Sequence, residues 1–305
     1  MNSEARKPSA RALSTVLLLG GLIFCAGPAA ADPYTDIQAQ LDGGKLRQAQ
    51  AAAQKLVAAG ATDCKAWALL ADANRRLTDI EGALKACKEG LAGCPGDKTL
   101  LRMAATLYDE REQYGDAATY YNQLWAVDSS DPFIGSRLGN ACFKSDRCDD
   151  GRKVFDALLT AHPERVEDRW VYAQLLSQSC KDHAAAEAQF QKLIAAQPKR
   201  LAFHCSRAFN LVASGQADAA VKAVQAGLAA VPSNNGCLYA AWGRALETSA
   251  DSLYAQGKVA EARAIYQTAV EPLQKGQADA LFGNYCKNLL ADVLYKQAPM
   301  EELKP

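Results

Sequence analysis

The sequence predicts an all-α protein assembled from repeated units, and three observations carry this prediction. Hydrophobic residues make up 49% of the chain, and much of that share is alanine, which favours helices. No stretch of useful length shows the alternation of Val, Ile and Thr that indicates a strand, and no Asn-Gly pair joins two such stretches. A common pattern of residues also returns along the chain every 34 residues.

The clearest repeats are Cys64–Asp97 and Lys98–Asp131. With Cys64 counted as position 1, positions 4, 7, 8, 20 and 32 of the first repeat are Trp67, Leu70, Ala71, Ala83 and Pro95. Positions 4, 7, 8, 11, 17, 20 and 24 of the next repeat are Leu101, Ala104, Ala105, Tyr108, Tyr114, Ala117 and Tyr121. This spacing resembles the tetratricopeptide repeat family, whose unit is a pair of antiparallel helices.

The resemblance implies an α-solenoid of about six to seven helix-turn-helix repeats that form a right-handed superhelix. One helical pair cannot bury its own apolar face, so successive pairs stack and bury that face between them. The resemblance covers nearly all of the chain after residue 31 and is specific for fold. It says little about function, because such arrays serve very many partners.

The repeat also predicts the order of the segments. Residues 32–63 form a partial first unit, with helices near 34–41 and 46–59. Five units follow, at 64–97, 98–131, 132–165, 166–200 and 201–234. The unit 166–200 is one residue longer, and we expect the extra residue in the turn around Ser179–His183. Residues 235–276 form a divergent unit whose long first helix runs from Gly236 to Gln256, and residues 277–305 form a capping helix and a tail.

The first 31 residues have the features of a secretory signal peptide. A basic start with Arg6, Lys7 and Arg11 precedes an apolar run of about 16 residues, shorter than the ~20 that span a bilayer. Small residues then lead to Ala31. We expect cleavage after Ala31 and a periplasmic or secreted protein. A retained anchor and a lipoprotein attached through Cys25 are the alternatives.

Charge limits the partners. The chain has 34 basic and 34 acidic residues; without the three basic and one acidic residue of the signal, 31 basic and 33 acidic residues remain, a net charge of −2. No basic run stands out, so nucleic acid is not an expected partner. No later segment is long and apolar enough to span a membrane. The expected partner is a protein or peptide, and self-association is possible.

The resemblance implies that the first helices line a concave groove through positions 2, 5, 9 and 12 of each unit. This arithmetic indicates a charged N-terminal half and an aromatic, apolar C-terminal half, in which a partner could hold its polar part near Arg75–Arg102 and its apolar part near Phe143–Phe209. A solvated face with aromatics that fill the packing is the alternative. The candidate partner-binding residues are Arg75, Arg76, Arg102, Asp109, Phe133, Asn140, Phe143, Trp170, Gln174 and Phe209.

The predicted export leads to an oxidising compartment, in which cysteines are expected to form disulfides. Ten cysteines are present, and nine remain without Cys25. Their positions at the edges of the array favour the bridges Cys64–Cys94 and Cys205–Cys237, and one bridge within a trio. The trio consists of Cys142, Cys148 and Cys180. Cys87 and Cys286 are expected to be buried thiols.

Neither a catalytic motif nor a metal motif is present, and we expect no cofactor, no metal and no enzymatic activity. The chain has three histidines. His183 and His204 fall at opposite ends of one helix, about 20 Å apart at 1.5 Å per residue, too far for a shared zinc ion. Haem-attachment, zinc-protease, nucleophile-elbow and phosphate-loop patterns are all missing.

The sequence therefore predicts a non-enzymatic scaffold or adaptor that binds partner segments, in the assembly of a bacterial cell envelope. Two alternatives stay open. One is a self-assembling structural component of an envelope complex. The other, by analogy with exported repeat proteins, is an accessory of polysaccharide synthesis or export.

Overall fold

A computed structural model of the protein describes residues 32–60, 63–232 and 235–301. Within these ranges the chain forms fifteen helices and no strand. The expected signal peptide, its Cys25 and residues 302–305 of the expected tail lie outside the described residues. For the part that the structure describes, the predicted all-α fold is confirmed.

Fourteen of these helices form seven consecutive pairs, and α15 (Gly283–Glu301) closes the array. The first helices of the pairs are α1 (Pro33–Asp42), α3 (Cys64–Arg76), α5 (Lys98–Glu110), α7 (Pro132–Lys144), α9 (Val166–Gln178), α11 (Leu201–Ala213) and α13 (Gly236–Ala255). The second helices are α2 (Leu46–Ala58), α4 (Ile80–Gly93), α6 (Tyr114–Val127), α8 (Cys148–Ala161), α10 (His183–Ala196), α12 (Ala217–Ala230) and α14 (Val259–Gly276).

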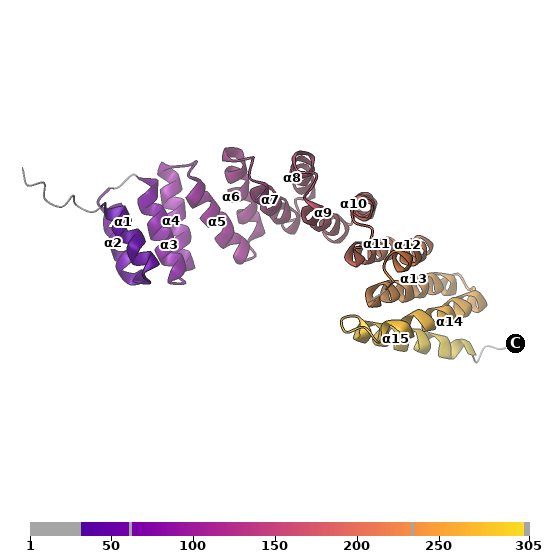
Figure 1. The fold of residues 1–305 in the computed structure, drawn as a ribbon. Coiled ribbons are helices and arrows are strands. Elements are labelled where there is room, and N and C mark those ends of the chain that lie inside the picture. Colours follow the sequence, from indigo (N-terminus) through magenta and orange to yellow (C-terminus); the bar gives the residue numbers. More distant parts are fainter. Residues whose placement is uncertain (1–31, 61–62, 233–234, 302–305) are drawn as a thin grey trace, which may run out of the picture.

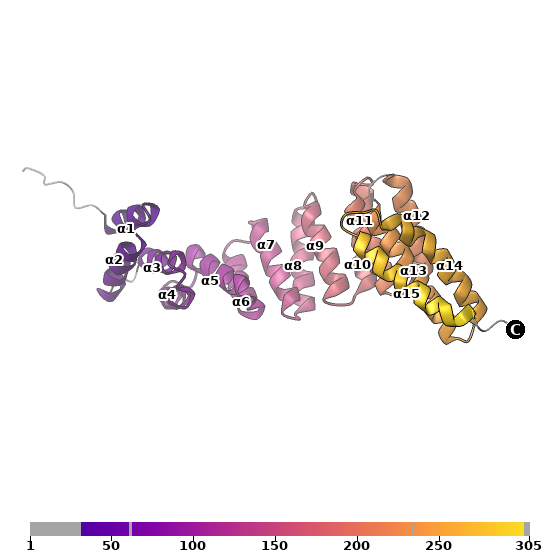
Figure 2. The same ribbon diagram turned by 90° about the horizontal axis from the view of Figure 1, so that it is seen from below.

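The pairs stack one after another into a solenoid. Each helix packs against its neighbours in the sequence, and the array extends from α1 to α15, which lie at its two ends (Figures 1 and 2). Its core follows the same path, because small and apolar residues such as Ala83, Ala117 and Leu138 are completely or almost completely buried between successive pairs. Burial between pairs is what holds a repeat array together.

The turn inside each pair contains one residue with a left-handed backbone, and these residues follow the period of the sequence. Most are 34 residues apart; the spacing is 35 before Lys181, where the turn between α9 and α10 holds the extra residue, as expected, and 42 before Gly257, which follows the long helix α13. For a residue other than glycine, this backbone conformation costs roughly 1 kcal/mol. The seven residues are Gly44, Thr78, Glu112, Asp146, Lys181, Gly215 and Gly257.

Three disulfides join parts of the array. Cys64–Cys94 ties α3 to the end of α4, with Cα atoms 6.0 Å apart. Cys148–Cys180 ties the start of α8 to the turn after α9, and Cys205–Cys237 ties α11 to α13. These are the pairs that the sequence favoured, with Cys148–Cys180 as the bridge within the trio. The described cysteines that form no bridge are Cys87, Cys142 and Cys286, and all three are buried.

This arrangement predicts which thiols react. Burial raises the pKa of Cys87 to about 12, and burial also raises the pKa of Cys142 and Cys286, so few thiolates form at neutral pH. Alkylation in denaturant without reductant should label these three described cysteines and leave the other six unlabelled, as read by mass spectrometry of peptides. Native protein should stay unlabelled at all nine. Any label on Cys64, Cys148 or Cys205 before reduction would show that its bridge is missing.

The C-terminal helix is held on α13 by a charged cluster. Nζ of Lys296 lies 2.7 Å from Oε1 of Glu247 and 3.0 Å from Oδ2 of Asp251. Glu247 is almost fully buried, which raises its pKa, and Nη1 of Arg244 donates to its second oxygen at 2.6 Å.

None of the described helices is long and apolar enough to cross a membrane.

Candidate functional site

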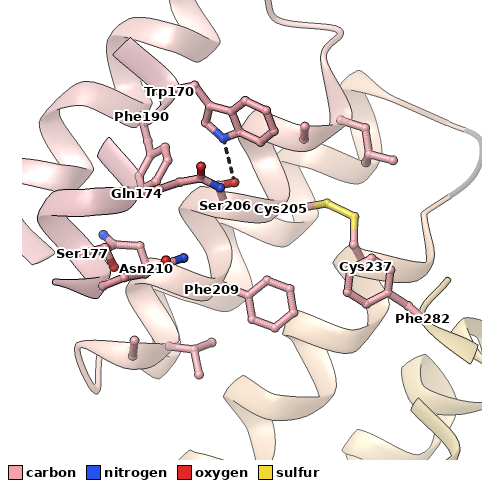
Figure 3. Close-up of a pocket in the computed structure, with 15 residues that line it drawn as sticks. Trp170, Gln174, Ser177, Phe190, Cys205, Ser206, Phe209, Asn210, Cys237 and Phe282 are labelled. Carbon is pink, nitrogen blue, oxygen red and sulfur yellow. Dashed lines mark hydrogen bonds between the residues drawn. A yellow bond between two sulfur atoms is a disulfide. The ribbon is translucent and has the colours of Figure 1, made fainter. Parts of the chain in front are cut away.

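A trough opens on the first helices of the C-terminal half of the array. It is a cavity of about 880 Å³ whose residues come from α9, α10, α11, α13 and the corner before α15 (Figure 3). We call it the trough. Its fifteen lining residues are Trp170, Gln174, Ser177, Gln178, Phe190, Leu201, Ala202, Cys205, Ser206, Phe209, Asn210, Val212, Ala213, Cys237 and Phe282.

Helix α11 supplies most of the lining, from Leu201 to Ala213. Its lining residues recur at intervals of three and four, which is the spacing of one face of an α-helix. The opposite face of α11 is buried in the array through Phe203, Ala208 and Leu211. The trough therefore runs along a helix whose inner face is fixed by the core.

Trp170 on α9 is held firmly at one side of the trough. Its indole Nε1 donates to Oγ of Ser206 on α11 at 3.0 Å (Figure 3). Its ring meets Phe203 edge-on, with centroids 5.9 Å apart, and the guanidinium of Arg200 lies 5.5 Å from the centroid. These contacts join two successive first helices and set the width of the trough between them.

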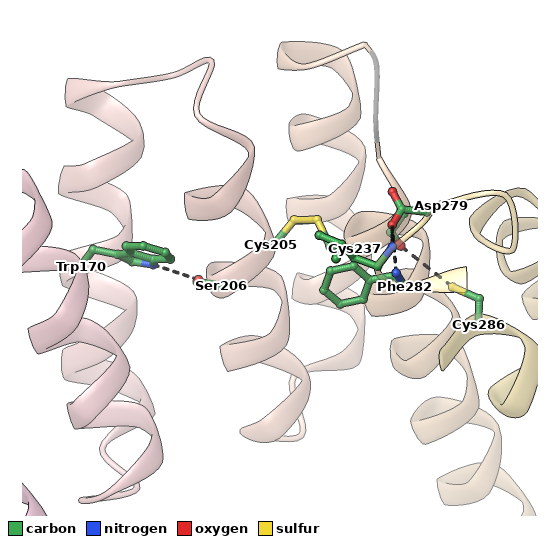
Figure 4. Close-up of a disulfide and its surroundings, with 9 residues drawn as sticks. Trp170, Cys205, Ser206, Cys237, Asp279, Phe282 and Cys286 are labelled. Carbon is green, nitrogen blue, oxygen red and sulfur yellow. Dashed lines mark hydrogen bonds between the residues drawn. A yellow bond between two sulfur atoms is a disulfide. The ribbon is translucent and has the colours of Figure 1, made fainter. Parts of the chain in front are cut away.

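The opposite side is built by the disulfide and by the corner before α15 (Figure 4). Cys205 and Cys237 link α11 to the first turn of α13, and Phe282 stacks on Phe209 with ring centroids 6.4 Å apart. Asp279 holds this corner, because its Oδ1 accepts hydrogen bonds at 2.9 Å from the main-chain nitrogens of Leu281 and Phe282. Those bonds lower the pKa of Asp279.

One part of the trough is polar. Nδ1 of His183 lies 3.0 Å from Oδ1 of Asn210 and 3.2 Å from Oγ of Ser177. Nδ2 of Asn210 donates to the main-chain oxygen of His183, so it is Oδ1 that faces the ring and Nδ1 that carries the proton. A base must accept the hydroxyl proton to activate a serine. The contact therefore positions Ser177 and Asn210 rather than making Ser177 a nucleophile.

The trough is uncharged. None of its fifteen described lining residues is Asp, Glu, Lys, Arg or His. A charged group that entered the trough would lose water without gaining a partner, which is costly, whereas an apolar side chain would gain about 25 cal/mol for each Å² that it buries. The site therefore favours apolar, uncharged groups.

The N-terminal half of the array presents a different surface. A hollow of about 320 Å³ there is lined by Arg75, Lys98, Thr99, Arg102, Met103, Thr106 and Glu110. Each of its cations is already paired: Arg75 with Asp72 at 2.6 Å, Lys98 with Asp128 at 2.8 Å, and Arg102 with Asp131 at 3.0 Å. These aspartates offset the charge of the three cations, and the exposed Glu110 adds a carboxylate to the hollow.

One predicted groove residue, Phe143, is buried in the core instead of lining the groove. The prediction that Phe143 lines the groove is wrong, because this side chain is 1% exposed and packs against the rings of Phe155 and Tyr172. The reason is Gly151 on α8, where a Cβ atom would stand 2.6 Å from the ring of Phe143. Most other units have alanine at this position, and glycine leaves the space that Phe143 fills.

The remaining candidates lie on or near the surface. Trp170, Gln174 and Phe209 line the trough, and Arg75 and Arg102 line the N-terminal hollow. The others do not line either cavity. Arg76 donates to the main-chain oxygen of Leu41, Asp109 pairs with Arg137, Phe133 is exposed beneath that same arginine, and Asn140 is half-buried.

The repeat arithmetic missed the residues that close the trough. Phe282 and Tyr285 both meet the ring of Phe209, and both come from the C-terminal corner, which has no position in the repeat. Ser206 lies one residue beyond a groove position, and only its hydrogen bond to Trp170 reveals its place. The only sequence signal for this corner is the presence of two aromatic residues, Phe282 and Tyr285, near the start of the predicted capping helix.

Comparison with known proteins gives a family and a fold. A family model described as "Tetratricopeptide repeat" matches residues 34–98 and 136–200. No curated protein matches the sequence. Among solved structures, the chain is similar to the C-terminal part of a repeat protein from Cytophaga hutchinsonii, with 11% identity, 78% of this chain and 94% of that chain covered, and a TM-score of 0.52.

Two further solved structures resemble the chain less closely in shape. A tetratricopeptide repeat protein from Parabacteroides merdae has 18% identity, with 86% of this chain and 99% of that chain covered and a TM-score of 0.48. YrrB, described as a repeat protein with an unusual peptide-binding site, has 14% identity, with 62% and 96% covered and a TM-score of 0.48. At these identities, likeness to solved structures concerns the fold alone.

Proposed function

Because this chain belongs to the tetratricopeptide repeat proteins, we propose that it is a non-enzymatic scaffold that binds a segment of a partner protein in the trough. Repeat arrays of this kind expose an extended concave surface that is well suited to such segments. The partner segment would bury apolar side chains between Trp170 and Phe282 and leave its charged residues outside.

The observation that carries this proposal is the trough itself, an uncharged cavity of about 880 Å³ beside aromatic side chains. Aromatic residues in a desolvated pocket are frequent binding anchors. Trp170, Phe209 and Phe282 are also held in place by their neighbours, through the hydrogen bond to Ser206 and the ring contacts. A partner therefore meets a surface that is already ordered, which lowers the entropy lost on binding.

The proposed setting is a bacterial cell envelope, outside the cytoplasm. Three disulfides support this setting, because such bonds form and persist in oxidising compartments. Signal-peptide features in residues 1–31 support it from the sequence. A role in envelope assembly is the form of scaffold function that we propose.

A second candidate, self-assembly, is favoured by one observation at the end of the array. Leu281, Leu294 and Tyr295 are 88%, 48% and 80% exposed at or beside α15. Leu294 and Tyr295 are neighbours in the sequence of this terminal helix, and exposed large apolar side chains are a feature of contact surfaces. The accessory role in polysaccharide synthesis or export remains a prediction that no observation on the structure favours.

Affinity capture from envelope extract should separate these functions. The protein serves as bait beside Gln174→Glu, which places a charge in the trough with almost no change of shape. We expect this variant to lose the partner, with binding weaker by about tenfold or more, ~1.4 kcal/mol. The matched control is Gln123→Glu, the same change on the exposed surface of α6, which should bind like the original protein.

A third bait, Tyr295→Glu, tests the exposed apolar side chains of α15. If the trough is the site, Tyr295→Glu keeps the partner. A different result would favour self-assembly through α15 over the proposed function. In that result the original bait and Gln174→Glu capture only further copies of this protein, and Tyr295→Glu captures none.

A further inference from the structure

We propose that the trough receives an α-helix of the partner, and that the buried face of this helix is apolar and uncharged. The inference rests on the proposed function, which it narrows from a partner segment to one conformation and one pattern of side chains. Three features of the trough lead to it: the hydrogen bonds of its polar residues, the spacing of its lining, and the ring contacts of its closed end.

Polar groups of the trough are mostly engaged within the chain. The indole N–H of Trp170 is bonded to Ser206, and both ends of the Asn210 amide are bonded to His183. Ser177 also contacts that histidine. Beyond the hydroxyl protons of Ser177 and Ser206, the side-chain amides of Gln174 and Gln178 are what the lining can offer to an occupant.

An extended segment would need more partners than these. Lining residues of α11 extend from Leu201 to Ala213, about 18 Å at 1.5 Å per residue. An extended chain covers that length with about five residues, which carry about ten main-chain donors and acceptors. Many of these groups would face the apolar floor unpaired. A helix satisfies its main-chain groups internally and presents only side chains, so it suits this floor.

The lining has the spacing of a helix-packing surface. Trp170, Gln174 and Ser177 on α9 stand at intervals of four and three, and Ala202, Cys205, Phe209 and Val212 on α11 stand at intervals of three, four and three. Two successive first helices thus turn matching stripes toward one cavity. Stripes of this period form the ridges and grooves between which another helix packs.

Two aromatic side chains from the C-terminal part of the chain already pack on Phe209, at one end of the trough. Phe282 stacks on Phe209, and Tyr285, in the first turn of α15, meets that ring edge-on, both with centroids 6.4 Å apart. The open part of the trough continues from these rings toward Trp170. An occupant that adds an aromatic or large aliphatic residue beside Phe209 would extend this row of rings.

Synthetic peptides test the inference directly. The probe is a fluorescently labelled, end-blocked peptide of about 15 residues, four helical turns, with Leu, Phe and Leu at i, i+4 and i+7 on an Ala and Gln background and Lys only on the opposite face. A second peptide replaces one central Ala by Pro, which breaks the helix. A third keeps the composition but scatters the apolar residues. Fluorescence anisotropy measures binding to the protein, to Gln174→Glu and to Gln123→Glu.

We expect the first peptide to bind at least about tenfold more tightly than either of the others, and to gain helical circular dichroism when bound. Gln174→Glu should weaken that binding by a similar factor, and Gln123→Glu should not. Equal binding of the proline peptide would overturn the inference in favour of an extended occupant. Equal binding of the scattered peptide, or no binding of the first, would overturn it as well. The proposed function would still hold in those cases if the original protein captures a partner from the extract and Gln174→Glu does not.

Discussion

Replacement of Phe143 by alanine lowers the free energy of unfolding by about 3–5 kcal/mol, because a buried ring is lost and a cavity is left behind. Phe143 is 1% exposed and contacts Phe155 and Tyr172 across three helices. Phe133, on the same helix α7, is 46% exposed and rests against Arg137. Its replacement by alanine should cost about 1 kcal/mol or less.

Urea unfolding followed by circular dichroism compares the two variants. The midpoint should fall clearly for Phe143→Ala and only slightly for Phe133→Ala, with equal helix content in the absence of urea. Equal midpoints would mean that Phe143 does not fill the space beside Gly151. Phe143 is therefore unsuitable for binding tests, because its replacement would weaken the fold and reduce binding indirectly.

Removal of the Cys205–Cys237 bridge should act on both stability and binding. Its cysteines are 32 residues apart, and release of a loop of this length costs about 3–4 kcal/mol in the chain-entropy model. The bridge also lines the trough and ties α13 to α11. We expect Cys205→Ser with Cys237→Ser to lower the unfolding midpoint and to weaken binding of the helical probe peptide by about tenfold.

The control for this pair is Cys64→Ser with Cys94→Ser. That bridge closes a loop of almost the same length, with a separation of 30 residues, and lies on α3 and at the end of α4, away from the trough. Its removal should cost a similar amount of stability and leave peptide binding unchanged. If both pairs weaken binding equally, the effect comes from general loosening of the array rather than from the wall of the trough.

Sequence reasoning succeeded where the chain is periodic. The 34-residue repeat predicted the helical pairs, and the same period reappears in the left-handed turn residues Thr78, Glu112 and Asp146. It also located the extra residue between α9 and α10, as well as the places along the array where Trp170 and Phe209 reach the surface. Local spacing determines these features, because the rotation between residues on a helix is constant.

Periodicity did not determine the place of a side chain where that place depends on its contacts in the folded array. Position 12 of a unit points into the groove by arithmetic, yet Phe143 turns inward because glycine at residue 151 leaves room beside it. The sequence indicated a charged N-terminal half but not the ion pairs within it. In the fold, Arg75, Lys98 and Arg102 each meet an aspartate, in two cases about 30 residues further along the chain.

Fold class, the order of the helical pairs and the edges where cysteines meet were thus determined by the sequence alone, since each depends on periodic local structure. The trough as an uncharged cavity was decided only by tertiary structure. Its walls come from α9, α11, α13 and the corner before α15, and Phe282 reaches it from outside the repeat. Whether a side chain is exposed or buried depends on the volumes that its neighbours leave empty, and those neighbours are brought together only when the array stacks.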